Sequence, residues 1–190
     1  MIEIFGWFWT SAILVIAVGL IFLVIGIYNN LVARRQDVRQ GVADIDAQLK
    51  QRHDLIPNLV ETVKGYAGHE ASTLESVIQA RNVAAKGNPS SGNEQGLKVA
   101  LDNLLALGED YPELKADGNF RELQLELSDI EDKLAAARRA LNAAAAQFNT
   151  ARESFPAVLF ASFLGFQEAD FDRLDDSEKG TVDQVPQIAF

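Results

Sequence analysis

The residues that could bind a metal are few in this chain. It has two histidines and no cysteine, which excludes a thiolate metal site, a cysteine nucleophile and a disulfide. His53 and His69 are sixteen positions apart, a turn of about 160° on an ideal helix, so they cannot share a metal on one helix face. Helical bundles can hold di-iron centres through Glu-x-x-His pairs, but Lys50 and Tyr66 occupy those glutamate positions here. The sequence predicts no metal site and no cofactor.

Motifs for hydrolysis or phosphate binding are also missing from the sequence. There is no H-E-x-x-H, P-loop or G-x-G-x-x-G, and the glycine-rich GNPSSGN at 87–93 lacks the Lys-Ser/Thr pair of a phosphate-binding loop. The 27 acidic residues are spread over expected helix faces rather than paired in a pocket. We therefore predict no catalytic residue and a protein that is not an enzyme, with a carboxylate-dependent hydrolase as the least favoured alternative.

A few polar residues fall where an apolar side chain is expected. Arg52 lies in the apolar register of a helix, and a buried charge there needs a carboxylate partner. The sequence does not choose among Glu70, Asp102 and Asp129. A buried pair would fix the helix register, and we favour that role over ligand recognition. The polar residues predicted to be buried or structural are Arg52, Asn58, Arg81, Asn142 and Asn149.

The elements that must position these residues are helices. Apolar residues recur at alternating spacings of three and four from Val38 to Tyr66 and again from Phe120 to Phe148, and no run alternates as a strand does. Pro57 lies inside the first run without changing its phase. We therefore expect one kinked helix that ends at 65–68 rather than at the proline.

Two shorter helices are expected between the long ones. The first ends near Lys86, the second ends near Gly108, and residues 110–118 then lead to the last helix, which Pro156 stops. The expected N-terminal cap pairs are Ser91 with Glu94 and Asn119 with Glu122. The predicted fold is all-α: one N-terminal transmembrane helix, followed by an antiparallel up-and-down four-helix bundle with long first and fourth helices.

The first thirty residues predict a membrane anchor. No charged side chain lies between Ile4 and Ala33. The distance from Trp9 to Tyr28 along a helix is about 28 Å, close to the hydrocarbon thickness of a bilayer. Trp7, Trp9 and Tyr28 would form the aromatic belts at its two boundaries. A cleaved signal peptide is disfavoured, because it needs a basic start, a shorter apolar stretch and a cleavage site.

The residues around the span predict its orientation and its contacts. Arg34 and Arg35 begin a basic stretch after the span, and the positive-inside rule then places the large domain in the cytoplasm, with the opposite side as the alternative. Ala12, Gly19 and Gly26 recur every seven residues. They would line one face for helix self-association, although small residues are common in membrane helices in general.

A second apolar stretch, FPAVLFASFLGF at 155–166, is too short to cross a bilayer. Phe160, Phe163 and Phe166 are spaced for one helical face. We expect the stretch to lie at the membrane surface or against a neighbouring protomer, with a cap over the open end of the bundle as an equal alternative. The predicted organisation is an anchor at 1–30, a bundle at 31–155, the apolar segment at 156–166 and an acidic, loop-like tail at 167–190.

Four sequence stretches resemble one family. They are YNNLVARRQDVRQGVADIDAQLKQRHDLIPNLVETVKGYAGHE at 28–70, ARNVA at 80–84, AARRALNAAAAQFN at 136–149 and SFPAVLFASFLGF at 154–166. In order and spacing they resemble the bacterial LemA proteins up to about residue 166. The resemblance implies a single-pass protein of the bacterial inner membrane with an antiparallel helical domain and no known catalytic activity. It also implies relatives encoded near membrane zinc proteases, some of them linked to membrane remodelling. The chain departs from the family pattern at Gly68, Ala140 and Leu141.

Charge and architecture together lead to the functional prediction. The formal net charge of −10 argues against a nucleic-acid partner, because such binding depends on neutralising phosphates. We predict a membrane-anchored helical scaffold that forms a homo-oligomer and engages the lipid bilayer or membrane-protein partners. The alternative, which depends mainly on the family resemblance, is an adaptor or regulator of a membrane protease.

Overall fold

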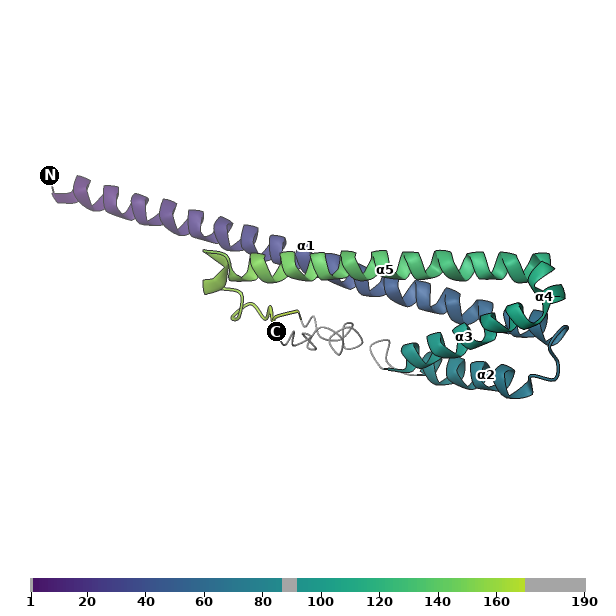
Figure 1. The fold of residues 1–190 in the computed structure, drawn as a ribbon. Helices are drawn as coiled ribbons and strands as arrows, with labels where there is room; N and C mark the ends of the chain where they lie inside the picture. Colours follow the sequence, from purple (N-terminus) through teal and green to yellow (C-terminus); the bar gives the residue numbers. More distant parts are fainter. Residues whose placement is uncertain (1, 87–91, 170–190) are drawn as a thin grey trace, which may run out of the picture. The chain divides into compact units, whose positions relative to one another are not determined.

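The computed structural model describes residues 2–86 and 92–169, which are helical apart from their connections (Figure 1). The elements are α1 (Ile2–Lys64), α2 (Ala71–Lys86), α3 (Asn93–Asp110), α4 (Pro112–Ala116), α5 (Gly118–Glu153) and a short 3-10 turn, η1 (Ala157–Leu159). The all-α prediction with long first and last helices is confirmed. The structure adds α4, a short helix in the stretch expected only to link α3 to α5. Residues 170–190 of the predicted tail lie outside the described residues.

The described chain divides into two compact units. One comprises residues 2–40 and 141–169 and contains the predicted span, and we call it the anchor unit. The other comprises residues 41–140 and is called the bundle unit. Both α1 and α5 contribute to each unit, and the anchor unit combines two segments that are far apart in the sequence.

The bundle unit has an aliphatic core. In it α2 packs on α3 and α3 contacts α4 (Figure 1). Arg52 faces Glu131 and Tyr66 faces Asp117, so α1 and α5 run antiparallel. Fully buried core side chains come from all five helices: Ile56, Leu59, Val63, Val77, Leu97, Leu104, Leu114, Phe120 and Ile130. The apolar periodicity of both long helices is thus confirmed over most of its length in this unit, except that Val42 and Tyr66 are exposed.

Pro57 lies inside α1, and the helix ends at Lys64, as predicted. A proline has no N–H, so the carbonyl of His53, four residues earlier, loses its partner within the helix. The Arg81 side chain of α2 replaces that partner, because its Nε donates to the His53 carbonyl at 2.8 Å. One long-range hydrogen bond therefore satisfies the carbonyl that the proline leaves without a helical donor.

The predicted helix caps are wrong. The N-cap of α3 is Gly92, without a side-chain hydrogen bond, and Glu94 points into the core instead; Ser91 lies outside the described residues. At the start of α5 the Phe120 N–H donates to Asp117 Oδ1 at 2.9 Å, so Asp117 takes the role expected of Asn119. This bond, followed by one from the Tyr66 hydroxyl, lowers the pKa of Asp117. The same Asp117 carboxylate raises the pKa of Tyr66.

Candidate membrane-interface site

The site is built on residues 154–167, which follow α5 and which we call the apolar loop. It has no charged residue, whereas Glu153 and Glu168 lie on either side of it. Its backbone turns through η1 and mixed hydrogen bonds, including Ala161 N to Ala157 O and Phe166 N to Ala161 O, rather than through a regular helix. The expected single helical face of Phe160, Phe163 and Phe166 is therefore wrong. Phe163 is 90% exposed, Phe166 is buried and Phe160 is half-buried.

The loop buries its two alanines and exposes several of its large side chains. Ala157 and Ala161 are buried, whereas Phe155 is 81% and Leu159 is 65% exposed. In a domain surrounded by water, burying the large apolar side chains gains the most free energy. The arrangement in the loop is the opposite, which is typical of a surface that contacts something apolar.

Phe166 fastens the loop to the end of the span. Its ring meets Tyr28 edge to face at a centroid distance of 5.6 Å and lies 6.4 Å from the ring of Phe148. The Arg35 guanidinium lies 5.0 Å from the centroid of the Phe166 ring, a cation–π contact. Gly165 precedes Phe166 with φ +78°, a left-handed conformation that favours glycine. This turn directs the Phe166 ring inward.

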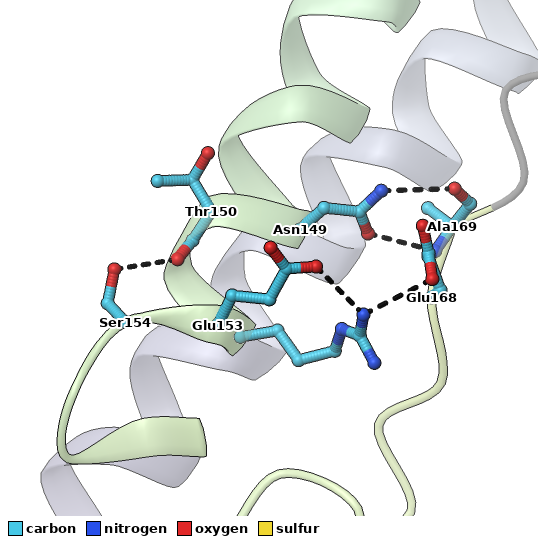
Figure 2. A network of polar contacts seen from close by, with 7 residues as sticks. Asn149, Thr150, Glu153, Ser154, Glu168 and Ala169 are labelled. Carbon is cyan, nitrogen blue, oxygen red and sulfur yellow. Dashed lines mark hydrogen bonds and ion pairs between the residues drawn. The ribbon is translucent and has the colours of Figure 1, made fainter.

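Two side chains of α5 clamp the far end of the loop (Figure 2). Asn149 Nδ2 donates to the Ala169 carbonyl at 3.2 Å, and the Ala169 N–H donates to Asn149 Oδ1 at 3.0 Å. Arg152 pairs with Glu153 at 3.0 Å and with Glu168 at 3.3 Å, the two acids that flank the loop. The C-terminal end of the loop is therefore held against α5, and its other end continues directly from that helix.

A cavity of about 260 Å³ lies beside this clamp. Its wall combines Arg35 and Glu168, of opposite charge, with the apolar side chains of Val38, Phe148 and Phe166. Because the wall carries one positive and one negative side chain, it gives no preference for an anionic over a cationic ligand.

The bundle unit holds a separate buried polar cluster. Arg52 is buried and lies 4.0 Å from Glu94 and 3.9 Å from Glu131, at charge-pair distances longer than hydrogen bonds. His53 Nε2 lies 3.1 Å from the other oxygen of Glu94. A buried carboxylate partner for Arg52 was predicted, but Glu70, Asp102 and Asp129 were the wrong candidates. The partner Glu94 comes from the first turn of α3, where the sequence suggested a helix cap.

The remaining predicted residues have different surroundings. Asn149 is buried, as predicted, and Arg81 is half-buried, whereas Asn58 and Asn142 are exposed. At the expected aromatic belts, Trp7, Trp9 and Tyr28 are exposed, and whether they contact lipid stays a prediction.

Sequence reasoning missed Glu94, Glu131 and Arg35. For Glu94 the signal was available, since it precedes the apolar residues Leu97 and Leu101 by three and seven positions.

The described residues contain no group of three or more histidine, aspartate or glutamate side chains that could hold a metal ion. They contain one helix that is long and apolar enough to cross a membrane, and no other described residue buries its apolar stretch. A long apolar N-terminal helix and a helical bundle with a buried charge cluster define the class: a helical protein with a candidate membrane anchor.

Comparison with known proteins identifies the family. Residues 41–190 match the LemA family, and the chain belongs to it. It is 24% identical over 173 residues to the magnetosome protein MamQ of Magnetospirillum gryphiswaldense, covering 76% of this chain and 64% of MamQ. It is 26% identical over 172 residues to the LemA protein of Metamycoplasma hominis, covering 85% of this chain and 78% of that protein. The chain thus aligns with less than two thirds of MamQ, and neither name denotes an enzyme.

Proposed function

We propose that this protein is a membrane-anchored helical scaffold that associates with itself and holds its bundle unit at a membrane for other membrane components to bind. The observation that carries the proposal is the surface of α1. From Ser11 to Ile25 its large apolar side chains are exposed, yet the same helix enters the core of the bundle unit without a break. An apolar surface of that length needs a lipid or protein partner.

Self-association is supported by the small residues of the span. Apart from its own stretch of helix backbone, a methyl group added at Gly19 or Gly26 would meet no atom of the described residues within 4 Å, so these residues leave the face open to another helix. Small residues at a helix interface let two helix backbones approach closely in lipid. The scaffold's own span is therefore the proposed assembly surface.

The test is the mass of the full-length protein in nanodiscs or detergent, measured by light scattering. We expect a uniform oligomer that dissociates in the Gly19→Leu/Gly26→Leu variant, because leucines would separate the backbones. Val18→Leu/Ile25→Leu is the matched control, since it enlarges or reshapes side chains beside that face without filling it. Monomers throughout would contradict self-association and direct the search to a different protein partner.

The proposed orientation places the bundle unit in the cytoplasm. Its support is the basic stretch after the span, which contains Arg34, Arg35 and Arg39, whereas residues 1–10 before the span contain no lysine or arginine. A single cysteine at the exposed position 125 tests this in intact cells. This cysteine should resist a membrane-impermeant maleimide until the inner membrane is opened. If it were labelled in cells in which only the outer layers are permeable, the bundle unit would lie on the outer side of the inner membrane.

A further inference from the structure

We propose that the apolar loop is a second membrane contact of this protein, in which Phe155, Leu159 and Phe163 enter the boundary region of the same bilayer that holds the span. The inference extends the proposed function, because it requires that the span lies in a membrane. It assigns the loop to lipid rather than to a second copy of the chain or to a cap on the bundle.

The first argument is position. Tyr28 and Ile27 mark the end of the apolar stretch of α1, where a spanning helix leaves the hydrocarbon. Phe166 contacts the Tyr28 ring, and Ile27 packs against the cluster that includes Phe166 and Ala161. Within the anchor unit, the loop therefore lies beside the residues that mark the lipid–water boundary.

The second argument is the sorting of side chains in the loop. The loop buries Ala157, Ala161 and Phe166, and the last two pack with Leu31 of α1 and Phe148 of α5, which is what a cap requires. Phe155, Leu159 and Phe163 remain exposed, and Phe163 is the most exposed of them at 90%. A cap alone leaves this exposure unexplained, whereas contact with lipid accounts for it.

The third argument is charge. No charged side chain occurs between Glu153 and Glu168, and Arg152 pairs with both of these acids at the base of the loop. The exposed surface can therefore enter the boundary region without carrying an unpaired charge into it. Aromatic side chains such as phenylalanine are favoured on the apolar face of interfacial segments. Since the loop is uncharged, its insertion should not require anionic lipid.

The test uses the full-length protein in nanodiscs of phosphatidylcholine. The chain has no cysteine, so a nitroxide label can be placed at one introduced cysteine at a time. The three positions are Phe163→Cys in the loop, Val18→Cys in the span and Leu125→Cys, which is 71% exposed in the bundle unit. Collision rates with oxygen, which concentrates in lipid, and with a water-soluble nickel complex give the depth of each label.

We expect the labels at 163 and 18 to favour oxygen and the label at 125 to favour nickel, with the label at 163 shallower than that at 18. Lipid contact at 18 together with a nickel-accessible label at 163 would overturn the inference about the loop and leave the proposed function standing. A label at 163 shielded from both reagents would also overturn it, in favour of a protein partner. A nickel-accessible label at 18 would overturn the proposed function itself.

A second variant checks that the effect is local. Phe163→Asp, combined with a label at Leu159→Cys, should move that label from lipid to water, because the new carboxylate resists desolvation. Leu125→Asp, which replaces an exposed apolar side chain of the bundle unit, is the matched control for the added charge. The thermal unfolding of the bundle should be the same in both variants, and equal depths of the 159 label in both would contradict a specific role for Phe163.

Discussion

The bundle unit and the anchor unit use the same helices in opposite ways. In the bundle unit, α1 and α5 bury Ile56, Leu59 and Ile130 completely, and the exposed side of each helix is mainly charged or polar. In the anchor unit, α1 exposes almost every large side chain of its apolar stretch, and the loop after α5 exposes Phe155 and Phe163. Apolar composition alone therefore does not define a core. The surroundings available to each segment, protein or lipid, decide which of its side chains are buried.

The largest effect is expected from charges in the span. Val18→Lys/Phe22→Lys should release the protein from membranes, because a lysine near the bilayer centre costs about 2.5–3.5 kcal/mol on insertion scales. Cell fractionation followed by alkaline washing measures the retained protein. Leu125→Lys, an exposed leucine of the bundle unit, is the control and should leave retention unchanged. Equal retention of both variants on membranes would contradict the claim that the span contacts lipid while the bundle unit contacts water.

The bundle unit should depend most on Arg52. Arg52→Leu leaves Glu94 buried without its cation, and breaking a buried pair costs about 3–5 kcal/mol of unfolding free energy. Urea unfolding followed by circular dichroism measures the loss. Lys50→Leu is the control, since Lys50 pairs with Asp54 at the exposed surface and should change stability little. If Arg52→Leu folded with normal stability but lost a binding partner, the structural role would be wrong.

A smaller effect should reveal why α1 tolerates Pro57. Arg81→Met removes the donor to the His53 carbonyl, and the loss of such a charge-assisted bond costs about 1.5–3 kcal/mol. In the Pro57→Ala background the restored N–H can take over, so the same Arg81→Met change should cost much less. The two single variants and the double variant, unfolded in urea, form a double-mutant cycle. If Arg81→Met cost the same unfolding free energy with and without Pro57, the bond from Arg81 would not compensate for the missing proline N–H.

The hydrogen bonds of Asn149 to Ala169 should stabilise the loop without affecting the bundle unit. Asn149→Ala removes both hydrogen bonds to Ala169, with an expected cost of about 1–2 kcal/mol for opening the loop. Limited proteolysis should then cut the loop faster, while the bundle unit unfolds at the same urea concentration. Asn142→Ala, at an exposed position of the same helix, is the matched control. Equal cleavage rates in the two variants would show that the clamp does not hold the loop.

The smallest effect concerns pH. The pKa of Asp117 is lowered, chiefly by the Phe120 N–H, so its contribution to stability is present above its ordinary value of 3.8 and is lost as pH falls through its folded value. The pKa of Tyr66 is raised by Asp117, so its contribution is present below its ordinary value of 10.0 and is lost as pH rises further. Asp117→Asn should flatten the stability profile at both ends. An unchanged profile would rule out this pair as its source.

The helices could be predicted from the sequence because their signal is local. The spacing of Leu127, Ile130 and Leu134 defines a buried face whatever packs against it, and the end of α1 after Pro57 followed from the unbroken phase of its apolar residues. The apolar span and the buried position of Arg52 could be predicted in the same way.

The partners of these faces could not be predicted, because they depend on how distant helices turn relative to each other. Glu94 reaches Arg52 only because the first turn of α3 faces the core. In the loop, regular helical spacing gave the wrong faces, because Gly165 turns the backbone and sends Phe166 inward while Phe163 points out. The Arg81 bond was also beyond prediction, although Pro57 implied that the His53 carbonyl needs another donor.

The central claim is that exposed apolar side chains of the two units face different solvents. Cysteines at Val18 and Leu125 test it directly, since both side chains are exposed within the chain, at 44% and 71%. The full-length protein in nanodiscs, open to water on both faces, would be treated with a water-soluble maleimide. We expect rapid labelling at 125 and almost none at 18 until detergent and denaturant remove the lipid. Labelling at similar rates at both positions in intact nanodiscs would contradict the account.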